Sequence, residues 1–174
     1  MLNFIKNLFL RLRKNQAIKQ NQVVRQNISF KSAKNIGVIF SLDDIQNPDT
    51  FSKFIKSLKT NGRNLQIIGY SKQPTISGLQ FQPKVFGYKD VSLWGEIRNE
   101  ELNNFIRTPF DYLFCLSKKP LPFFDYILAN SPAKCRICQY ADGRHLVAEM
   151  IIKPKPNAPE EKLYERFLYY TQLL

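Results

Sequence analysis

At 174 residues the chain has room for one domain with a substantial apolar core, but it is short for two complete nucleotide-binding halves. Its 26 lysines and arginines outnumber its 14 acidic residues, and the net charge of +12 favours an anionic partner such as RNA, DNA or anionic lipid. No apolar run approaches the roughly 18–20 residues that span a bilayer. Basic residues also interrupt the first apolar residues too early for a signal peptide, so we expect neither a membrane span nor export.

The positive charge is concentrated at the start of the chain. Residues 1–34 hold eight lysines and arginines and no acidic residue, so they carry +8 of the total and leave +4 for residues 35–174. We therefore divide the chain into a basic amphipathic helical arm, residues 1–34, and a single α/β domain, residues 35–174.

The spacing of apolar residues predicts a helix over Met1–Asn27. Placed at 100° per residue, its apolar side gathers Met1, Leu2, Phe4, Ile5, Leu8, Phe9 and Leu12. Leu10 falls outside that side. Three interpretations of the helix stay open: its apolar side packs on the domain or on a second copy in a homodimer, it lies on an anionic membrane, or its charges follow nucleic-acid phosphates.

Strands and helices alternate along the rest of the chain. We expect strands at Lys34–Ser41, Leu65–Tyr70, Val85–Phe86, Tyr112–Leu116, Arg136–Gln139 and Ala148–Ile152. We expect helices at Phe51–Thr60, Arg98–Ile106, Leu121–Ala129 and Glu160–Leu173. Asp49 or Thr50 is the predicted cap of the first of these helices, and Asn61-Gly62 its predicted stop. Residues 71–82 are rich in Pro, Gly, Ser and Gln and predict a loop.

The fold class follows from the segment Pro109–Tyr140, which reads as strand, helix and strand. The near-continuous apolar run Tyr112–Leu116 is typical of a parallel strand that helices cover on both faces. Together with the alternation of strands and helices, it predicts a doubly wound, mostly parallel sheet of the Rossmann-like or flavodoxin-like kind.

The candidate ligand positions follow the first strand and the central strand. In a doubly wound sheet, ligands bind beyond the carboxyl ends of the strands. Asp43 and Asp44 follow the first strand, where paired carboxylates suit a metal or a general base, although such acids are commonly solvated turn residues. Ser117 and Lys118 follow the central strand, where the cation suits a phosphate. No glycine follows the first strand, so we expect neither a dinucleotide site nor a P-loop.

The three cysteines predict structural thiols in a reduced, cytoplasmic protein. Cys135 and Cys138 have the spacing of a redox or zinc pair, but they fall in a predicted strand, where residues three apart point to opposite faces. A closed zinc site would need two more ligands, and only Cys115 and His145 are available. We therefore expect no metal site and no cofactor.

Six segments carry a resemblance to a known family: the basic N-terminal helix, Ser32–Phe40, Phe51–Leu65, Asp111–Leu113, Ser131–Lys134 and Glu149–Ile152. Through them the whole chain resembles a family of small uncharacterised bacterial proteins of unknown function, which implies no activity. Phe110–Ser117 and Leu128–Gln139 also resemble part of the acceptor-binding half of heptosyltransferase-type glycosyltransferases. The chain is too short for the complete two-domain transferase, so this local resemblance implies no catalytic residue.

We expect a binding protein rather than an enzyme, with RNA, in particular the ribosome, as its partner, because cationic arms gain affinity from counterion release. The residues expected to bind nucleic acid are Lys6, Arg11, Arg13, Lys14, Lys19 and Arg25. One alternative is a protein peripheral to the inner membrane, anchored by the same helix. Another is the relic of an enzyme that binds a small molecule or a nucleotide sugar at the sheet edge near Asp43, Asp44, Ser117 and Lys118.

Overall fold

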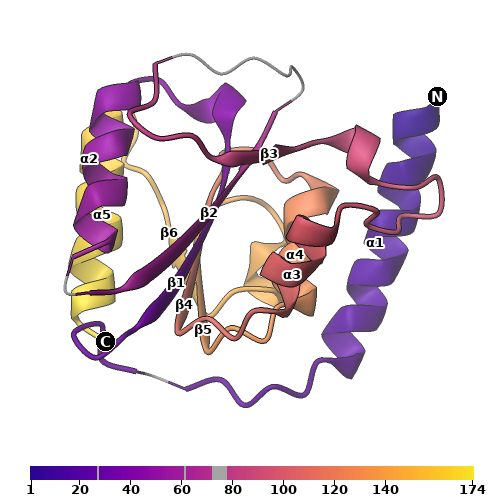
Figure 1. Ribbon diagram of the computed structural model, residues 1–174, viewed down its shortest axis with the longest axis horizontal. Coiled ribbons are helices and arrows are strands. Elements are labelled where there is room, and N and C mark those ends of the chain that lie inside the picture. Colours follow the sequence, from indigo (N-terminus) through magenta and orange to yellow (C-terminus); the bar gives the residue numbers. More distant parts are fainter. Residues whose placement is uncertain (27, 61, 72–77) are drawn as a thin grey trace.

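The computed structural model describes residues 1–26, 28–60, 62–71 and 78–174. Figure 1 shows one sheet between two layers of helices, with a further helix on the outer flank. The helices are α1 (Leu2–Gln20), α2 (Pro48–Leu58), α3 (Glu100–Arg107), α4 (Pro122–Asn130) and α5 (Glu160–Gln172). The strands are β1 (Asn35–Ser41), β2 (Asn64–Tyr70), β3 (Lys84–Phe86), β4 (Tyr112–Leu116), β5 (Cys135–Gln139) and β6 (Met150–Ile152).

The six strands form one parallel sheet in the order β3-β2-β1-β4-β5-β6. This is the strand order of the Rossmann fold, whereas flavodoxin-like sheets have the order 2-1-3-4-5. The predicted fold class is therefore confirmed, and of the two predicted kinds of sheet the Rossmann-like one is observed. The central strands β1 and β4 pair from Ile36 opposite Tyr112 to Phe40 opposite Leu116, and the strand order reverses between them.

Helices cover both faces of the sheet, which explains the uninterrupted apolar run of β4. All five residues of β4 are buried. On one face, Phe54 of α2 and Phe167 of α5 pack against Phe114 of β4, with ring centroids 6.3 and 6.2 Å away. On the other face, α3 and α4 pack over Leu113 and Cys115 of the same strand. Because no face of β4 meets water, the alternation that marks a half-buried strand is absent.

The predicted elements recur in the structure, and the differences occur at the ends of helices and strands, as at β6, which begins at Met150 rather than at Ala148. Asn47, rather than Asp49 or Thr50, caps α2, because its Oδ1 accepts a hydrogen bond from the backbone N–H of Thr50 (3.0 Å). Gly62 has a φ of +68°, the left-handed conformation expected just after that helix. Asn61 lies outside the described residues, as do residues 72–77 of the predicted loop.

Helix α1 is shorter than predicted and packs by an unexpected side. It ends at Gln20, where the side-chain amide of Asn21 donates hydrogen bonds to the carbonyls of Ala129 (2.7 Å) and Ser131 (3.1 Å) and leads the chain away from the helix. Asn27, the predicted end, lies outside the described residues. Leu10, the exception in the sequence pattern, is fully buried. Of the predicted apolar side, Ile5 and Phe9 are partly buried, whereas the other five residues stay exposed: Met1, Leu2, Phe4, Leu8 and Leu12.

Asp111 joins three segments at the amino ends of the strands. Its Oδ2 accepts hydrogen bonds from the backbone N–H groups of Lys34 (2.8 Å) and Asn35 (3.0 Å), and its Oδ1 lies 2.9 Å from Lys134 Nζ. Burial by itself would raise the pKa of Asp111, but the bonds from Asn35, Lys134 and Lys34 outweigh it and hold this pKa below its ordinary value of 3.8. The ionised carboxylate therefore stabilises the folded chain.

We expect Asp111→Asn to lower the free energy of unfolding at neutral pH by about 1–3 kcal/mol. Because the folded-state pKa is depressed, the contribution of Asp111 is fully present above the ordinary pKa and is lost as the pH falls through the folded-state value. The difference between wild type and variant should therefore shrink below about pH 4. Urea unfolding at several pH values measures it. Asp43→Asn, which alters an exposed carboxylate, is the control and should change stability by less than about 0.5 kcal/mol.

Candidate functional site

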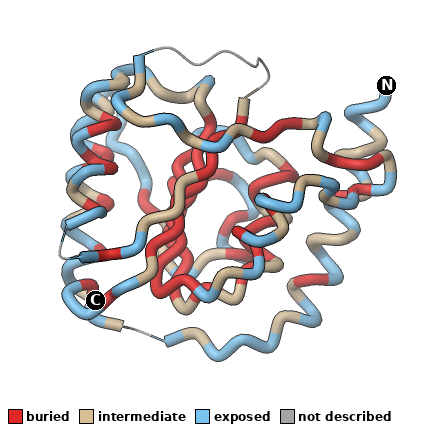
Figure 2. The backbone as a smooth tube through the Cα atoms, in the orientation of Figure 1, coloured by how far each residue is buried: buried red, intermediate tan, exposed pale blue. Residues whose placement is uncertain are grey.

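A row of apolar side chains is exposed along the first three turns of α1. Phe4, Leu8 and Leu12 are 75%, 50% and 52% exposed, and their four-residue spacing places them on one side of the helix. Met1 is exposed on the same side and completes what we call the outer stripe, and Leu2 beside it is exposed as well. Figure 2 shows exposed residues along much of α1, which lies at the edge of the molecule.

Polar bonds hold the opposite side of α1 against the segment that follows β3. Lys6 Nζ donates a hydrogen bond to the carbonyl of Tyr88 (2.7 Å). Arg13 Nη2 pairs with Glu96 Oε1 (2.9 Å), and its Nε donates to the carbonyl of Trp94 (2.8 Å). These bonds fix the rotation of α1 about its own axis, so the outer stripe is held facing away from the domain.

Close backbone packing supports the same orientation. The ring of Phe9 meets the ring of Trp94 edge-on, with the centroids 5.2 Å apart. Gly95 next to it has a φ of +73°, and a Cβ there would lie 3.1 Å from the backbone nitrogen of Leu10. Only glycine suits both this left-handed conformation and this close approach. Trp94 itself is 59% exposed, so it adds an aromatic ring beside α1.

The structure divides the six basic residues predicted to bind nucleic acid into two groups. Lys6 and Arg13 bond to the domain as described, and Arg25 Nη1 donates hydrogen bonds to the carbonyls of Ser131 (3.2 Å) and Ala133. The other three make no hydrogen bond or ion pair with the part of the chain that the structure describes: Arg11, Lys14 and Lys19. Half of the predicted set is thus engaged within the protein.

The predicted ligand edge is partly closed by its own side chains. Asp44 Oδ2 accepts hydrogen bonds from Ser117 Oγ (3.2 Å) and from the backbone N–H of Lys118 (2.9 Å). The structure thus brings Asp44, Ser117 and Lys118 together, whereas Asp43 is exposed. Asp44 thus caps the loop after β4. Its carboxylate bridges the chain ends that follow β1 and β4, so the place where the strand order reverses is not open to a ligand.

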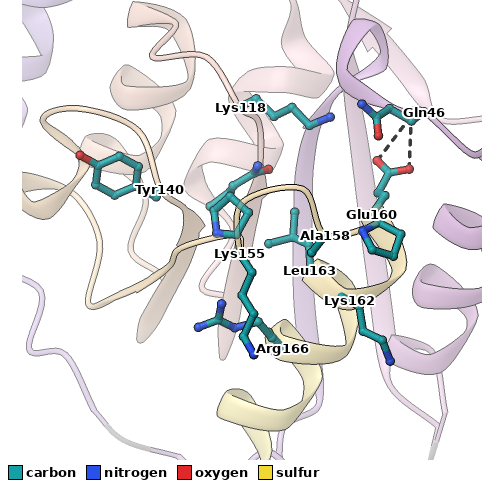
Figure 3. A pocket seen from close by; sticks show the side chains of 12 residues that line it. Gln46, Lys118, Tyr140, Lys155, Ala158, Glu160, Lys162, Leu163 and Arg166 are labelled. Carbon is teal, nitrogen blue, oxygen red and sulfur yellow. Dashed lines mark hydrogen bonds between the residues drawn. The ribbon is translucent and has the colours of Figure 1, made fainter.

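A pocket of about 250 Å³ lies beside this edge, between the end of β5, the chain after β6 and the start of α5 (Figure 3). We call it the α5 pocket. Its lining residues are Gln46, Lys118, Gln139, Tyr140, Pro154, Lys155, Ala158, Pro159, Glu160, Lys162, Leu163 and Arg166. Of the predicted ligand residues, only Lys118 lines it.

The cysteines lie as the strand pattern predicts. Cys135 packs in the core under α2 and α5, whereas Cys138 packs in the core on the opposite face of the sheet, beside Cys115 on the neighbouring strand. All three are buried free thiols, and burial raises the pKa of Cys135 to about 11. Among the residues that the structure describes, no three His, Cys, Asp or Glu side chains are grouped to hold a metal ion.

None of the helices in the described ranges combines the length and the apolar character needed to cross a bilayer. Any membrane contact through α1 would therefore have to be made along its side. That geometry is the one of an interfacial helix, which lies in the plane of the membrane surface.

The strand order and the helices on both faces define an α/β protein of the Rossmann-like class. Residues 6–174 match the profile of a family described as "Family of unknown function (DUF6913)", and the chain belongs to that family. No curated protein and no solved structure matched the chain in the other two comparisons. The local resemblance to heptosyltransferase-type enzymes stays a prediction.

Sequence reasoning missed most of the α5 pocket. Gln139 is the last residue of β5 and therefore lies at the same edge as Ser117, a position that the strand assignment already implied. Lys155 and Arg166 come from the chain after β6 and from α5, and no sequence pattern connects them with the strand ends. Only the docking of α5 brings these residues to the sheet edge.

Proposed function

We propose that this protein is a non-catalytic peripheral membrane-binding protein whose α1 lies on an anionic lipid surface. The observation that carries the proposal is the outer stripe, which is exposed although α1 is docked. A soluble monomer rarely leaves a contiguous apolar patch uncovered unless the patch binds a partner or a membrane. Here the patch is straight, helical and convex, which suits a flat surface better than a groove.

Charge favours an anionic bilayer as the occupant. Residues 1–34 contain no acidic residue, and Arg11, Lys14 and Lys19 form no ion pair within the described chain, although the charges of Lys14 and Arg11 also attract Asp125 of α4. Each Lys or Arg near an anionic surface contributes about 1 kcal/mol of attraction. Phe4 and Trp94 supply the aromatic rings that proteins place at the level of lipid headgroups.

The apolar side chains add the larger share of the binding energy. Fully burying a Leu or Phe side chain contributes about 1.5–3 kcal/mol, and Phe4, Leu8 and Leu12 are each at least half exposed before binding. Because the opposite side of α1 is held by Lys6 and Arg13, the helix presents these side chains without first rotating or detaching. Binding would therefore not require the domain to open.

We expect the full chain to float with phosphatidylcholine vesicles that contain phosphatidylglycerol, and to float much less with phosphatidylcholine alone. Phe4→Asp combined with Leu8→Asp should weaken binding at least about tenfold, because both apolar contributions are lost. The matched control is Leu146→Asp with Leu173→Asp, which changes two leucines that are 53% and 66% exposed elsewhere on the surface. Circular dichroism checks that both variants are folded.

Two outcomes would reject the proposal. One is a chain that ignores anionic vesicles at low salt, or whose Phe4→Asp and Leu8→Asp variant floats as well as the wild type. The other is comigration with ribosomal particles that nuclease abolishes and that depends on Arg11, Lys14 and Lys19 but not on Phe4 and Leu8. The second result would establish the RNA partner expected from the charge of the arm.

A further inference from the structure

We infer that the α5 pocket binds a small phosphorylated ligand, independently of the membrane surface of α1. The pocket lies at the carboxyl ends of the strands, which is the edge where Rossmann-like sheets bind ligands. It is displaced from the reversal point toward β5 and α5, because Asp44 and Ser117 close the position between β1 and β4.

The position of the Gln139 amide is the first argument. Gln139 is only 5% exposed and lines the pocket, and its side-chain amide makes no hydrogen bond within the described ranges of the chain. The polar atoms of this amide are not among the fully buried ones that lack a partner in the described chain, so they are open to the pocket and free to bind a ligand. Ile137, two residues earlier on β5, packs in the core under α2 and α5, so the alternation of the strand directs Gln139 to the same face, toward the pocket.

An excess of positive charge is the second argument. Lys118, Lys155 and Arg166 line the pocket, and none of them forms an ion pair with an acidic residue in the described chain. In Figure 3, Lys118 lies along the upper end of the pocket, and Lys155 and Arg166 lie near one another at the lower end. Like charges gathered at one cavity repel one another, and an anionic ligand would relieve that repulsion.

The acidic residue of the pocket does not neutralise these cations. Glu160 turns its carboxylate toward the start of α2, where it accepts hydrogen bonds from the backbone N–H groups of Gln46 (3.2 Å) and Asn47 (2.9 Å). Figure 3 shows the two bonds to Gln46 as dashed lines. Glu160 also accepts a hydrogen bond from Tyr164 Oη (2.8 Å), so its oxygens are occupied.

Helix α5 adds to the attraction of an anion. Pro159 and Glu160 at its start both line the pocket, and a helix of 13 residues carries partial positive charge at its N-terminus. Lys162, one turn further, is paired with Glu165 (2.8 Å) and points away from the cavity in Figure 3. The ligand would therefore meet the helix start, the Gln139 amide and three cations that form no ion pair in the described chain, one of which, Arg166, lies over the Tyr170 ring.

The size of the pocket limits the ligand. Pockets for drug-sized molecules measure about 300–1,000 Å³, whereas this one measures about 250 Å³. It has room for a phosphate group with a small polar substituent, which the Gln139 amide would recognise. No glycine follows β1, so backbone N–H groups do not cradle a diphosphate there, and side chains have to bind the anion.

Titration of the full chain with inorganic pyrophosphate tests the inference by calorimetry and by backbone NMR. We expect saturable binding, with the largest shifts at Gln139, Lys155 and the first turn of α5. Lys155→Gln combined with Arg166→Gln should weaken binding at least about tenfold, and Gln139→Leu should weaken it severalfold without loss of fold. The matched control is Lys53→Gln with Lys59→Gln, which removes two exposed charges, one from α2 and one from its C-cap.

The inference fails if pyrophosphate does not saturate, or if the control on α2 weakens binding as much as the Lys155 and Arg166 variant does. The latter result would mean attraction by net charge alone. Phe4→Asp with Leu8→Asp should leave pyrophosphate binding unchanged, because α1 and the α5 pocket share no residue. Failure of the membrane proposal and failure of the pocket are therefore separate results.

Discussion

Replacing Arg144 with methionine is expected to lower the free energy of unfolding by about 3–5 kcal/mol. Arg144 is fully buried. Its Nη1 donates hydrogen bonds of 2.8 Å to the carbonyls of Ser117 and Gln139, and its Nη2 donates one of 3.1 Å to the carbonyl of Lys119. One guanidinium thus ties the chain after β4 to the end of β5, and methionine would leave all three carbonyls without this donor.

The partner charge makes the loss larger. Arg144 Nε lies 3.6 Å from Asp125 Oδ1, and the charge of Arg144 acts on this carboxylate more strongly than those of Lys14 and Arg11 on α1. Burial raises the pKa of Asp125, and the charge of Arg144 opposes that rise. In Arg144→Met we therefore expect Asp125 to take up a proton, because an uncompensated buried carboxylate is costly.

Urea unfolding followed by circular dichroism measures this effect. Arg144→Met combined with Asp125→Leu should recover part of the lost stability, because the stranded carboxyl is removed together with its partner. Arg98→Met, at an exposed arginine, should stay within about 0.5 kcal/mol of the wild type. A loss below about 1 kcal/mol in Arg144→Met would show that other groups hold the two loops.

The second large effect separates the two sides of α1. Leu10→Ala should lower the free energy of unfolding by about 2–5 kcal/mol, because Leu10 is fully buried against the domain. Leu12→Ala should change stability little, because Leu12 is half exposed. For vesicle binding, the expected order is the reverse: Leu12→Ala weakens it, whereas Leu10→Ala leaves the outer stripe intact.

Chemical unfolding and vesicle flotation of the two variants measure this crossed pattern, and hydrogen exchange of the α1 amides reports whether Leu10→Ala loosens the helix. The two substitutions remove the same atoms from positions two residues apart, so composition and charge are identical. If Leu12→Ala is the more destabilising variant, the orientation of α1 is wrong. If both variants bind vesicles equally well, Leu12 takes no part in lipid contact.

The sequence was most informative where complete burial requires every residue of a strand to be apolar. Tyr112–Leu116 was predicted with its observed bounds, because a strand covered on both faces needs a continuous apolar run. The alternation of strands and helices then predicted a doubly wound sheet. The alternation did not distinguish the Rossmann-like strand order from the flavodoxin-like one. Which strands lie side by side depends on the face of the sheet over which each connecting helix passes.

The orientation of α1 was beyond the reach of the helical pattern. That pattern correctly gathers Phe4, Leu8 and Leu12 on one side, but it does not say whether that side meets protein, a membrane or water. The packed side instead carries Leu10 and Ala17, which join the core, and Lys6 and Arg13, which bond to the segment after β3. A single buried leucine, Leu10, is a weak sequence signal beside five exposed apolar residues.

The α5 pocket was hidden for a different reason. Its predicted member, Lys118, follows a strand that the apolar run identifies, but Lys155 and Arg166 reach the same edge only through the path of the chain after β6. Asp43 and Asp44 were predicted as a pair. Asp44 turned out to cap the next loop, because its carboxylate accepts the backbone N–H of Lys118.

During synthesis, α1 leaves the ribosome before the part of the domain on which it packs. Leu10 docks beside α4, whose last residue is Asn130, so the helix precedes its partner by more than a hundred residues of synthesis. At about 5–20 residues per second, that interval lasts roughly 5–20 s. During this time Leu10 and the outer stripe are exposed together on the nascent chain. A chaperone or a nearby membrane can therefore bind the apolar residues of α1 before α4 has been synthesised and the domain has folded.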